Sequence, residues 1–294
     1  MSPPGEIDLH IHTTASSDGQ HTPEEIFAMA KSLGLKAIAF ADHNSVENVA
    51  EGMRLSQKHG IELVPCFELN TSYDGMDIHI LAYFIDHRDR SLKEWFREIH
   101  EAKIAQAKGR LEKLKNLGFE IEWSHIESNA RGLIPSGATF LKALLNGEKS
   151  AGDPRLKPYI DGERSNSPSL NFYRDYFRKG APAFVPLDVC SAGEGIRRIK
   201  ELGGVPVQAH PSDTGDERIE RFIEMGLMGL EAYSSYHSPD ECEHFRTMAE
   251  RHGLVYTAGS DFHGREIKPD VEMACIPGNR YDILERLKNE RSKL

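Results

Sequence analysis

Short apolar segments alternate with amphipathic helical patterns along most of this 294-residue chain, and polar residues stand where the apolar segments end. The segment Ala37–Ala41, for example, is followed by Asp42 and His43, and the segment Val205–Ala209 is followed by His210. Parallel strands joined by helices close most economically into a barrel whose reactive groups lie at the carboxyl ends of the strands. The alternation therefore predicts an α/β barrel with these polar residues gathered at one end.

Six histidines and three acids occupy such positions. They are His10, His12, Asp18, His43, Glu68, His79, His210, Asp261 and His263. Residues i and i+2 of a strand point to the same face, so His10 and His12 can reach one ion. A lone histidine beside an apolar segment is usually a core residue satisfied by a hydrogen bond. Nine such residues together are typical of a metal or catalytic site, and we interpret them as a distributed set of ligands for several metal ions.

The middle of the chain has a different character. A long charged helical pattern covers Leu92–Leu117, and the segments 147–154 and 161–168 are typical of loops. Strand patterns return after residue 181. We expect residues 1–90 and 181–294 to form one barrel domain, with residues 91–180 as a mainly helical insertion that covers the active site.

Composition limits the classes of partner. The net charge of −10 disfavours an extended interface with the phosphate backbone of a nucleic acid. A small phosphorylated substrate, by contrast, could bind in a local cationic pocket. The four cysteines form no C-x-x-C pair, which favours reduced thiols. The N-terminal residues have no signal-peptide pattern and no segment is apolar enough to span a membrane, so we expect a cytoplasmic protein without membrane contact. The sequence indicates no protein partner.

Four motifs resemble, in kind and in order, those of the polymerase and histidinol phosphatase (PHP) family. They are Asp8-Leu9-His10-Ile11-His12, Ala41-Asp42-His43, Ala209-His210-Pro211 and Gly259-Ser260-Asp261-Phe262-His263, and they flank nearly the whole chain. The helical insertion and the segment 231–238 resemble the family's branch of metal-dependent phosphoesterases. That branch includes phosphatases acting on nucleotides with a 3′ phosphate and 5′-to-3′ exonucleases acting on short RNA.

The resemblance implies a distorted (β/α)7 barrel that holds two or three divalent ions, with manganese, iron or zinc as candidates. One ion would take His10, His12, Glu68 and Asp261. A second would share Glu68 and add His79 and His210. A third would take Asp18, His43 and His263. Because histidine often fills the position of Asp18 in the family, the third site here is slightly harder and more tolerant of Mn²⁺ or Fe²⁺.

Four further residues have predicted roles around this metal centre. Asp8 and Asp42 stand next to ligands and are expected to accept hydrogen bonds that orient the imidazole rings. His237 is a candidate for binding the phosphate or for protonating the leaving oxygen, and Lys179 is a candidate for binding the phosphate. A solvated loop histidine and an ordinary surface lysine are the alternatives for these last two.

The ligand charges favour phosphoester hydrolysis. Three divalent ions bring more positive charge than three carboxylates cancel, and a phosphate ester with a hydroxide satisfies that excess better than an amide does. We therefore predict a phosphatase in which a hydroxide bridging two metal ions attacks a small phosphate ester, with a nucleotide or nucleoside bisphosphate as the expected substrate.

Three alternatives remain open: a 5′-to-3′ exonuclease on short oligonucleotides, a non-catalytic metal-binding module, and an amide or lactone hydrolase. Many relatives carry Arg-Pro-His in the insertion where this chain has Ile134-Pro135-Ser136, which weakens the preference for nucleotides. The nearby Arg131 does not match that motif. The insertion has basic residues that could supply charge to track an oligonucleotide, namely Lys103, Lys108, Arg110, Lys113 and Lys115. The interleaved acids Glu98, Glu101 and Glu112 favour an ordinary solvated helix face instead.

Overall fold

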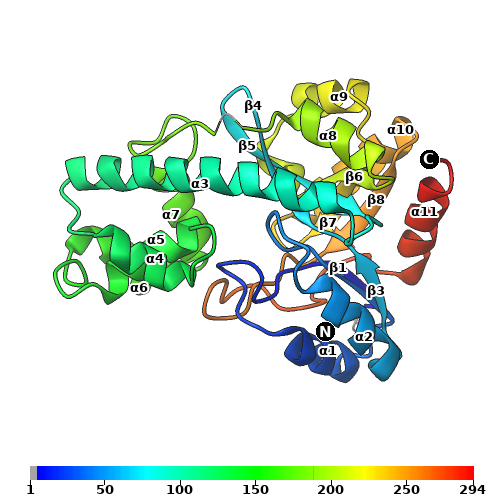
Figure 1. The fold of residues 1–294 in the computed structure, drawn as a ribbon, viewed down its shortest axis with the longest axis horizontal. Helices are drawn as coiled ribbons and strands as arrows, with labels where there is room; N and C mark the ends of the chain where they lie inside the picture. The colour runs from blue at the N-terminus through cyan, green and yellow to red at the C-terminus, as the bar shows by residue number, and fades with distance from the viewer. Residues whose placement is uncertain (1–4, 188) are drawn as a thin grey trace.

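The computed structural model describes residues 5–187 and 189–294. Its strands are β1 (Ile7–Ile11), β2 (Ala37–Phe40), β3 (Glu62–Pro65), β4 (Glu68–Tyr73), β5 (Met76–Tyr83), β6 (Val205–Gln208), β7 (Gly229–Ser234) and β8 (Val255–Gly259). Its helices are α1 (Pro23–Ser32), α2 (Val49–His59), α3 (Arg90–Asn116), α4 (Trp123–Ala130), α5 (Gly137–Asn146), η1 (Pro154–Leu156), α6 (Lys157–Ile160), α7 (Pro168–Tyr176), α8 (Ala192–Glu201), η2 (Pro211–Asp213), α9 (Asp216–Glu224), α10 (Pro239–Arg251) and α11 (Tyr281–Arg291). The predicted α/β class is confirmed (Figure 1).

The strands form two sheets, with the orders β1-β2-β3 and β4-β5-β6-β7-β8. Most neighbours are parallel, but β5 is antiparallel to both β4 and β6. This reversal comes from the two-residue turn Asp74-Gly75, in which both residues have positive φ. Asp-Gly is a strong hairpin signal for that reason. A single closed seven-stranded barrel is therefore not confirmed, because the described strands do not pair into one closed sheet.

Hydrogen bonds beyond the strand ends join the two sheets at both margins. At one margin the Asp261 amide donates to the His10 carbonyl at 2.9 Å, and the His12 amide donates to the Phe262 carbonyl at 2.9 Å. At the other, the Glu68 amide donates to the Asp42 carbonyl at 3.1 Å. These bonds bring the ends of β1, β2 and β8 and the start of β4 together, at the place where the candidate ligands stand.

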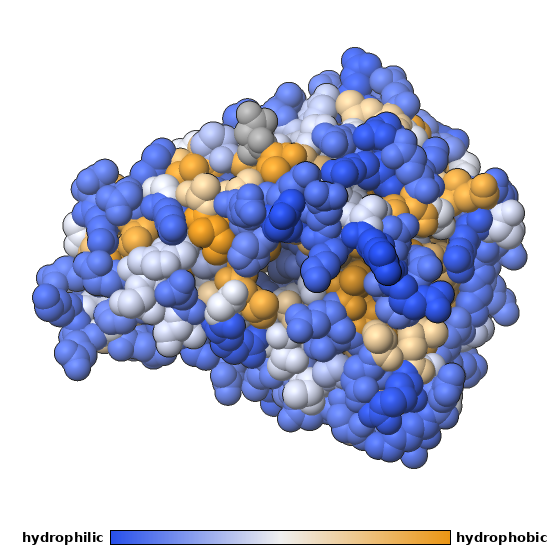
Figure 2. All heavy atoms as spheres, viewed as in Figure 1, coloured by the Kyte–Doolittle hydropathy of each residue, from blue (hydrophilic) through white to orange (hydrophobic). Residues whose placement is uncertain are grey.

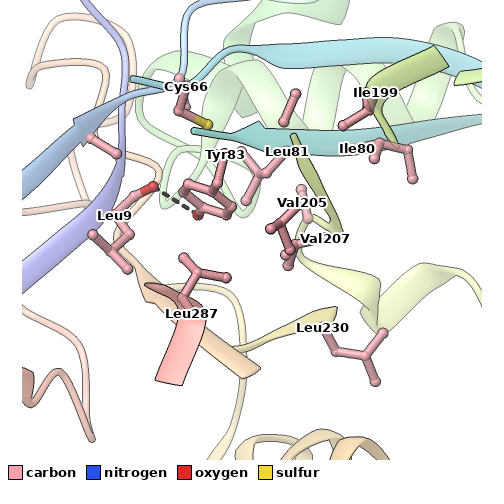
Figure 3. Packing of buried hydrophobic residues seen from close by; sticks show 14 of the residues in the cluster. Leu9, Cys66, Ile80, Leu81, Tyr83, Ile199, Val205, Val207, Leu230 and Leu287 are labelled. Carbon is pink, nitrogen blue, oxygen red and sulfur yellow. Dashed lines mark hydrogen bonds between the residues drawn. The ribbon is translucent and has the colours of Figure 1, made fainter. Parts of the chain in front are cut away.

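The main hydrophobic core lies between the strands and the helices that cover them. Figure 3 shows side chains from β1, β5, β6, β7 and α11 converging there. Tyr83 is fully buried in this core, and its hydroxyl donates to the Leu9 carbonyl at 2.9 Å. Burying an aromatic ring of this size contributes roughly 2–3 kcal/mol, and pairing its hydroxyl removes the cost of burying that polar group. The core thus fixes the position of β1, which carries His10 and is directly followed by His12.

Every helix and 3-10 helix from α3 to α7 lies within residues 90–176, and no described strand lies there. Figure 1 shows α3 extending away from the sheets, with α4–α6 below its far half. A second hydrophobic core, made by residues of α3, α4, α5 and α7, holds these helices together. The division into a barrel domain and an insertion domain stays a prediction. None of the helices in the described ranges is both long and apolar enough to cross a membrane.

Candidate metal centre

A cavity of about 1170 Å³ lies between the strand ends and the helical segment. Figure 2 shows one face of the molecule, with mostly hydrophilic residues around the hollow near its centre. Seven of the nine candidate ligands line the cavity. They are Asp18, His43, Glu68, His79, His210, Asp261 and His263. The other two, His10 and His12, are completely buried beneath them.

Two histidines and two acids surround the deepest point of the site. His10 lies on β1 and His12 directly follows that strand, and their Nε2 atoms lie 3.2 Å apart. The His12 Nε2 is 3.1 Å from Oδ1 of Asp261 and 3.3 Å from Oε2 of Glu68. One donor atom from each of the four residues falls within 4.8 Å of the others. This is the group that was expected to hold the first ion.

The other two expected groups are also brought together, with His43 close to both. Oε1 of Glu68 lies 3.0 Å from Nδ1 of His79 and 3.2 Å from Nε2 of His210. Oε2 of the same carboxylate lies 2.9 Å from Nδ1 of His43. His43 also forms a four-residue group with His12, Asp18 and His263. Glu68 thus lies between the groups, and both of its oxygens face imidazole nitrogens.

Several buried polar atoms at this site make no hydrogen bond with the described residues, although Glu68 Oε2 and His43 Nδ1 lie only 2.9 Å apart. They are Asp18 Oδ1, His43 Nδ1, Glu68 Oε2 and Asp261 Oδ1. Leaving a charged oxygen buried and unpaired is costly, and a bound cation removes that cost. Imidazole and carboxylate donors suit Mn²⁺, Fe²⁺ and Zn²⁺. The donor set therefore fits a cluster of divalent ions.

Backbone conformation supports the same interpretation. His210 has φ 27° and Asp261 has φ 57°, which are conformations that residues other than glycine rarely adopt. Such strain costs of the order of 1–3 kcal/mol and persists mainly at functional sites. The fold tolerates it here at two of the candidate ligands.

The ionisation states of two of the candidate ligands, Glu68 and His263, also suit metal binding. Burial opposes ionisation of Glu68, but the charges of His79 and His43 outweigh it and hold the pKa of Glu68 well below its usual range. Burial, together with the charge of His12, holds the pKa of His263 well below its usual range. Metal ligands must be deprotonated, so an ionised Glu68 and a neutral His263 are in the required forms.

Glu231 of β7 is a site residue that the sequence analysis missed. Its fully buried carboxylate accepts from Nδ1 of His10 at 2.9 Å and from the His210 amide at 2.9 Å. A proton on Nδ1 of His10 leaves the lone pair on Nε2 free to bind a metal ion, together with the other candidate ligands. The one signal in the sequence is an acid inside the apolar segment Leu230-Glu231-Ala232.

Glu231→Gln is expected to lower metal affinity and activity about 10- to 100-fold, since outer partners of ligating histidines contribute about that much. The new amide brings a donor to a place where His10 and the His210 backbone both donate. Titration of the stripped protein with Mn²⁺ would measure the change, with the exposed Glu243→Gln as the matched control. Equal affinity in the two variants would contradict this role.

Asp8 and Asp42 do not contact imidazole rings, so their predicted role needs correction. Asp8 accepts from the amides of Ser260 and Ala274 at 2.9 and 2.8 Å. Asp42 accepts from Thr13 and from Oγ of Ser16, and that hydroxyl lies 3.2 Å from Nδ1 of His12. A buried carboxylate without hydrogen bonds is costly, so both acids accept hydrogen bonds from nearby backbone amides and hydroxyl groups. Asp8 therefore holds the backbone around Asp261, and Asp42 reaches His12 only through Ser16.

The two residues with predicted substrate roles lie in different surroundings. Lys179 lines the cavity, and its ammonium donates to the Asp74 carbonyl in the β4–β5 turn. His237 is outside the cavity lining, where its Nδ1 lies 2.9 Å from the Ala232 carbonyl and its ring packs against Phe245. Its predicted contact with the substrate has no geometric support.

Two cationic residues near the ligands were also missed or left without a role. Nζ of Lys268 and the Tyr236 hydroxyl lie 2.6 and 2.8 Å from Oδ2 of Asp261, which leaves Oδ1 for the histidines. Arg131 donates to the carbonyls of Ser16 and Gly19 at 2.7 and 2.8 Å. Arg131 thus ties the helical segment to the turn that carries Asp18.

Comparison with known proteins agrees with this geometry. The family model of the PHP domain matches residues 8–144. The chain is 29% identical to a 3′,5′-nucleoside bisphosphate phosphatase from Chromobacterium violaceum, over 92% of this chain and 94% of the relative. It is 27% identical to the 5′-3′ exoribonuclease Rnm from Salmonella typhimurium, over 87% of this chain and 84% of the relative.

A solved structure shares the whole architecture. It belongs to a candidate metal-dependent phosphoesterase from Bifidobacterium adolescentis, with a TM-score of 0.77 and 25% identity, and the match covers 98% of each chain. The four motifs, the family match and this structural likeness agree. The family model thus identifies a PHP domain in residues 8–144, and the structural likeness extends over nearly the whole chain.

Proposed function

We propose that this protein is a metal-dependent phosphoesterase that hydrolyses a small phosphate ester, with a nucleotide or nucleoside bisphosphate as the preferred substrate. The convergence of nine imidazole and carboxylate side chains, with buried donor atoms that lack partners, carries this proposal. The similarity to a 3′,5′-nucleoside bisphosphate phosphatase along nearly the whole chain supports the choice of substrate.

In this proposal the residues form three ion sites. His10, His12, Glu68 and Asp261 hold the first ion. Glu68, His79 and His210 hold the second. Asp18, His43 and His263 hold the third, with manganese, iron or zinc as the metal. When bound, such ions lower the pKa of a coordinated water towards neutrality and offset the charge of the phosphate oxygens.

The protein's own residues keep that arrangement fixed. Glu231 holds the His10 ring with Nε2 towards the cluster. Lys268 and Tyr236 occupy one oxygen of Asp261, so the carboxylate can turn only its other oxygen to a ligand position. Preorganised charge of this kind needs little rearrangement during the reaction, which favours catalysis.

We also propose that the two sheets act together as a distorted barrel, with residues 91–180 as an insertion domain that covers the site. Residues of α3 and of β4 and β5 line the same cavity, which supports this division of roles. A 5′-to-3′ exonuclease on short RNA is the second candidate function. The basic residues that α3 places in the cavity and the similarity to an exoribonuclease favour it.

A phosphate-release assay on a substrate panel tests the proposed function. The panel holds adenosine 3′,5′-bisphosphate, an aryl phosphate, 5′-phosphorylated short RNA and a simple amide, each with Mn²⁺. We expect inorganic phosphate from the bisphosphate at the highest kcat/KM. Release of mononucleotides from RNA at a higher kcat/KM would favour the exonuclease, and acid release from the amide alone would contradict both.

A further inference from the structure

Helix α3 turns a basic face towards the cavity. Five basic or imidazole residues of α3 line the cavity, beside Phe96: Lys93, Arg97, His100, Lys103 and Arg110. Their spacings of three, four and seven residues place them on one side of a helix. Lys108, Lys113 and Lys115 do not line it. Lys103 and Arg110 are only 9% and 3% exposed. The prediction that the basic residues of α3 lie on an ordinary solvated face is therefore wrong for these two.

Arg110 is fixed close to the metal centre by Asp77 of β5. Its Nη2 lies 3.3 Å from Oδ2 of Asp77, and the Tyr173 hydroxyl donates to the same oxygen at 2.7 Å. Asp77 and the candidate ligand His79 are alternate residues of one strand, so they share a face and lie about 7 Å apart. Arg110 is therefore held by a residue on the same face of β5 as the candidate ligand His79.

Lys103 has no hydrogen bond or ion pair with any residue in the ranges 5–187 and 189–294, although it is nine-tenths buried. A cation in that position is costly unless it has an anionic partner. Burial and the nearby charge of Arg110 together lower the pKa of Lys103 to about 8, although the charge of Asp77 opposes the shift. A bound phosphate would supply the missing partner and keep this lysine charged.

The balance of charge in the cavity points the same way. Apart from the proposed ligands, the lining holds eight lysines and arginines but only three acids, in a chain whose net charge is −10. The one acid of this set near Lys103, Asp77, is already engaged by Arg110 and Tyr173. The cavity beside the metal centre therefore has an excess of positive charge that could bind a second anionic group of a substrate.

We infer that Lys103 and Arg110 form a binding site for a second phosphate group, carried by the same substrate whose first phosphate lies at the metal centre. The inference rests on the proposed function and names its substrate class, a compact sugar bisphosphate. The shared chemistry also fits the next phosphate of an oligonucleotide. A monophosphate would leave this second site empty.

Lys103→Met tests the inference, because methionine keeps an apolar stem of similar length without the charge. The ratio of kcat/KM for adenosine 3′,5′-bisphosphate to that for an aryl phosphate should fall about 10- to 100-fold, mainly through KM, as expected for one lost charged hydrogen bond. Lys103→Arg should keep most of the ratio. Lys108→Met, a change on the same helix at a residue outside the cavity lining, is the matched control and should keep the wild-type ratio.

Metal content and circular dichroism must match among these proteins. An unchanged ratio in Lys103→Met would overturn the inference. A loss confined to 5′-phosphorylated short RNA would overturn the assignment to a bisphosphate. The absence of turnover by the unaltered, metal-loaded protein would instead overturn the proposed function, and the inference with it, so the two failures are distinguishable.

Discussion

Glu68→Gln is expected to lower kcat about a thousandfold or more, which corresponds to roughly 4 kcal/mol in the activation free energy. Both oxygens of Glu68 lie between 2.9 and 3.3 Å from nitrogens of four histidines. An amide replaces one of these oxygens with a group that cannot bind a cation, and it removes the charge that two ion sites share. Metal analysis and phosphate release on the same preparation would measure the effect.

Glu47→Gln is the matched control for this change. Glu47 follows the His43 loop and is exposed, so its substitution should leave metal content and kcat unaltered. Circular dichroism of both variants would show whether the fold persists. A Glu68→Gln protein that holds as much metal as the wild type, and turns over at a similar rate, would refute the role of Glu68 as the shared ligand.

His210→Ala is expected to have the second largest effect, a loss of about a hundredfold or more in kcat. The loss should exceed that for a residue that only supports a ligand, which is about 10- to 100-fold. Nε2 of His210 lies 3.2 Å from Glu68, and the side chain is 26% exposed on the cavity wall. Since the ring is not a core group, the melting temperature of the metal-free protein should change little.

His244→Ala controls for the loss of an imidazole. His244 lies on α10, where its exposed side chain pairs with Asp216. Its substitution should change neither kcat nor metal content. Full activity in His210→Ala would count against the assignment of the second ion site, even with Glu68→Gln inactive.

The convergence of the nine candidate ligands could be predicted from sequence because most of them stand at or just beyond a strand end. Parallel strands share one edge at their carboxyl ends, so residues such as His43, His210 and His263 meet there whatever the details of the loops. The class of the fold followed from the same alternation of strands and helices. Neither prediction needed the exact number or direction of the strands.

The reversed direction of β5 was missed because the argument from alternation treats every strand as parallel. The dipeptide Asp74-Gly75 carries the opposite signal, since both residues of a two-residue hairpin turn need positive φ. One closed barrel was expected for the same reason. The observed hairpin places Glu68 and His79 on paired strands. His79 lies two residues along β5 from Leu81, the residue that pairs with Glu68, so the two side chains are diagonal neighbours on one face.

Residues whose roles depend on distant partners could not be predicted. Glu231 lies 221 positions from His10 along the chain, and an acid inside a strand reveals nothing about which ring it will contact. The spacing of basic residues on α3 defines a helix face but not what covers that face. Only the fold turns Lys103 and Arg110 towards the cavity and leaves Lys108 outside it.

The most direct test of a metal-dependent phosphoesterase is to follow bound metal and phosphate release together in one preparation of the full chain. The protein would be stripped with a chelator, reloaded with Mn²⁺ in steps and assayed on adenosine 3′,5′-bisphosphate at each step. We predict that turnover disappears on stripping and returns in proportion to the bound metal. Turnover that survives complete stripping, or its absence in fully loaded protein, would contradict the account.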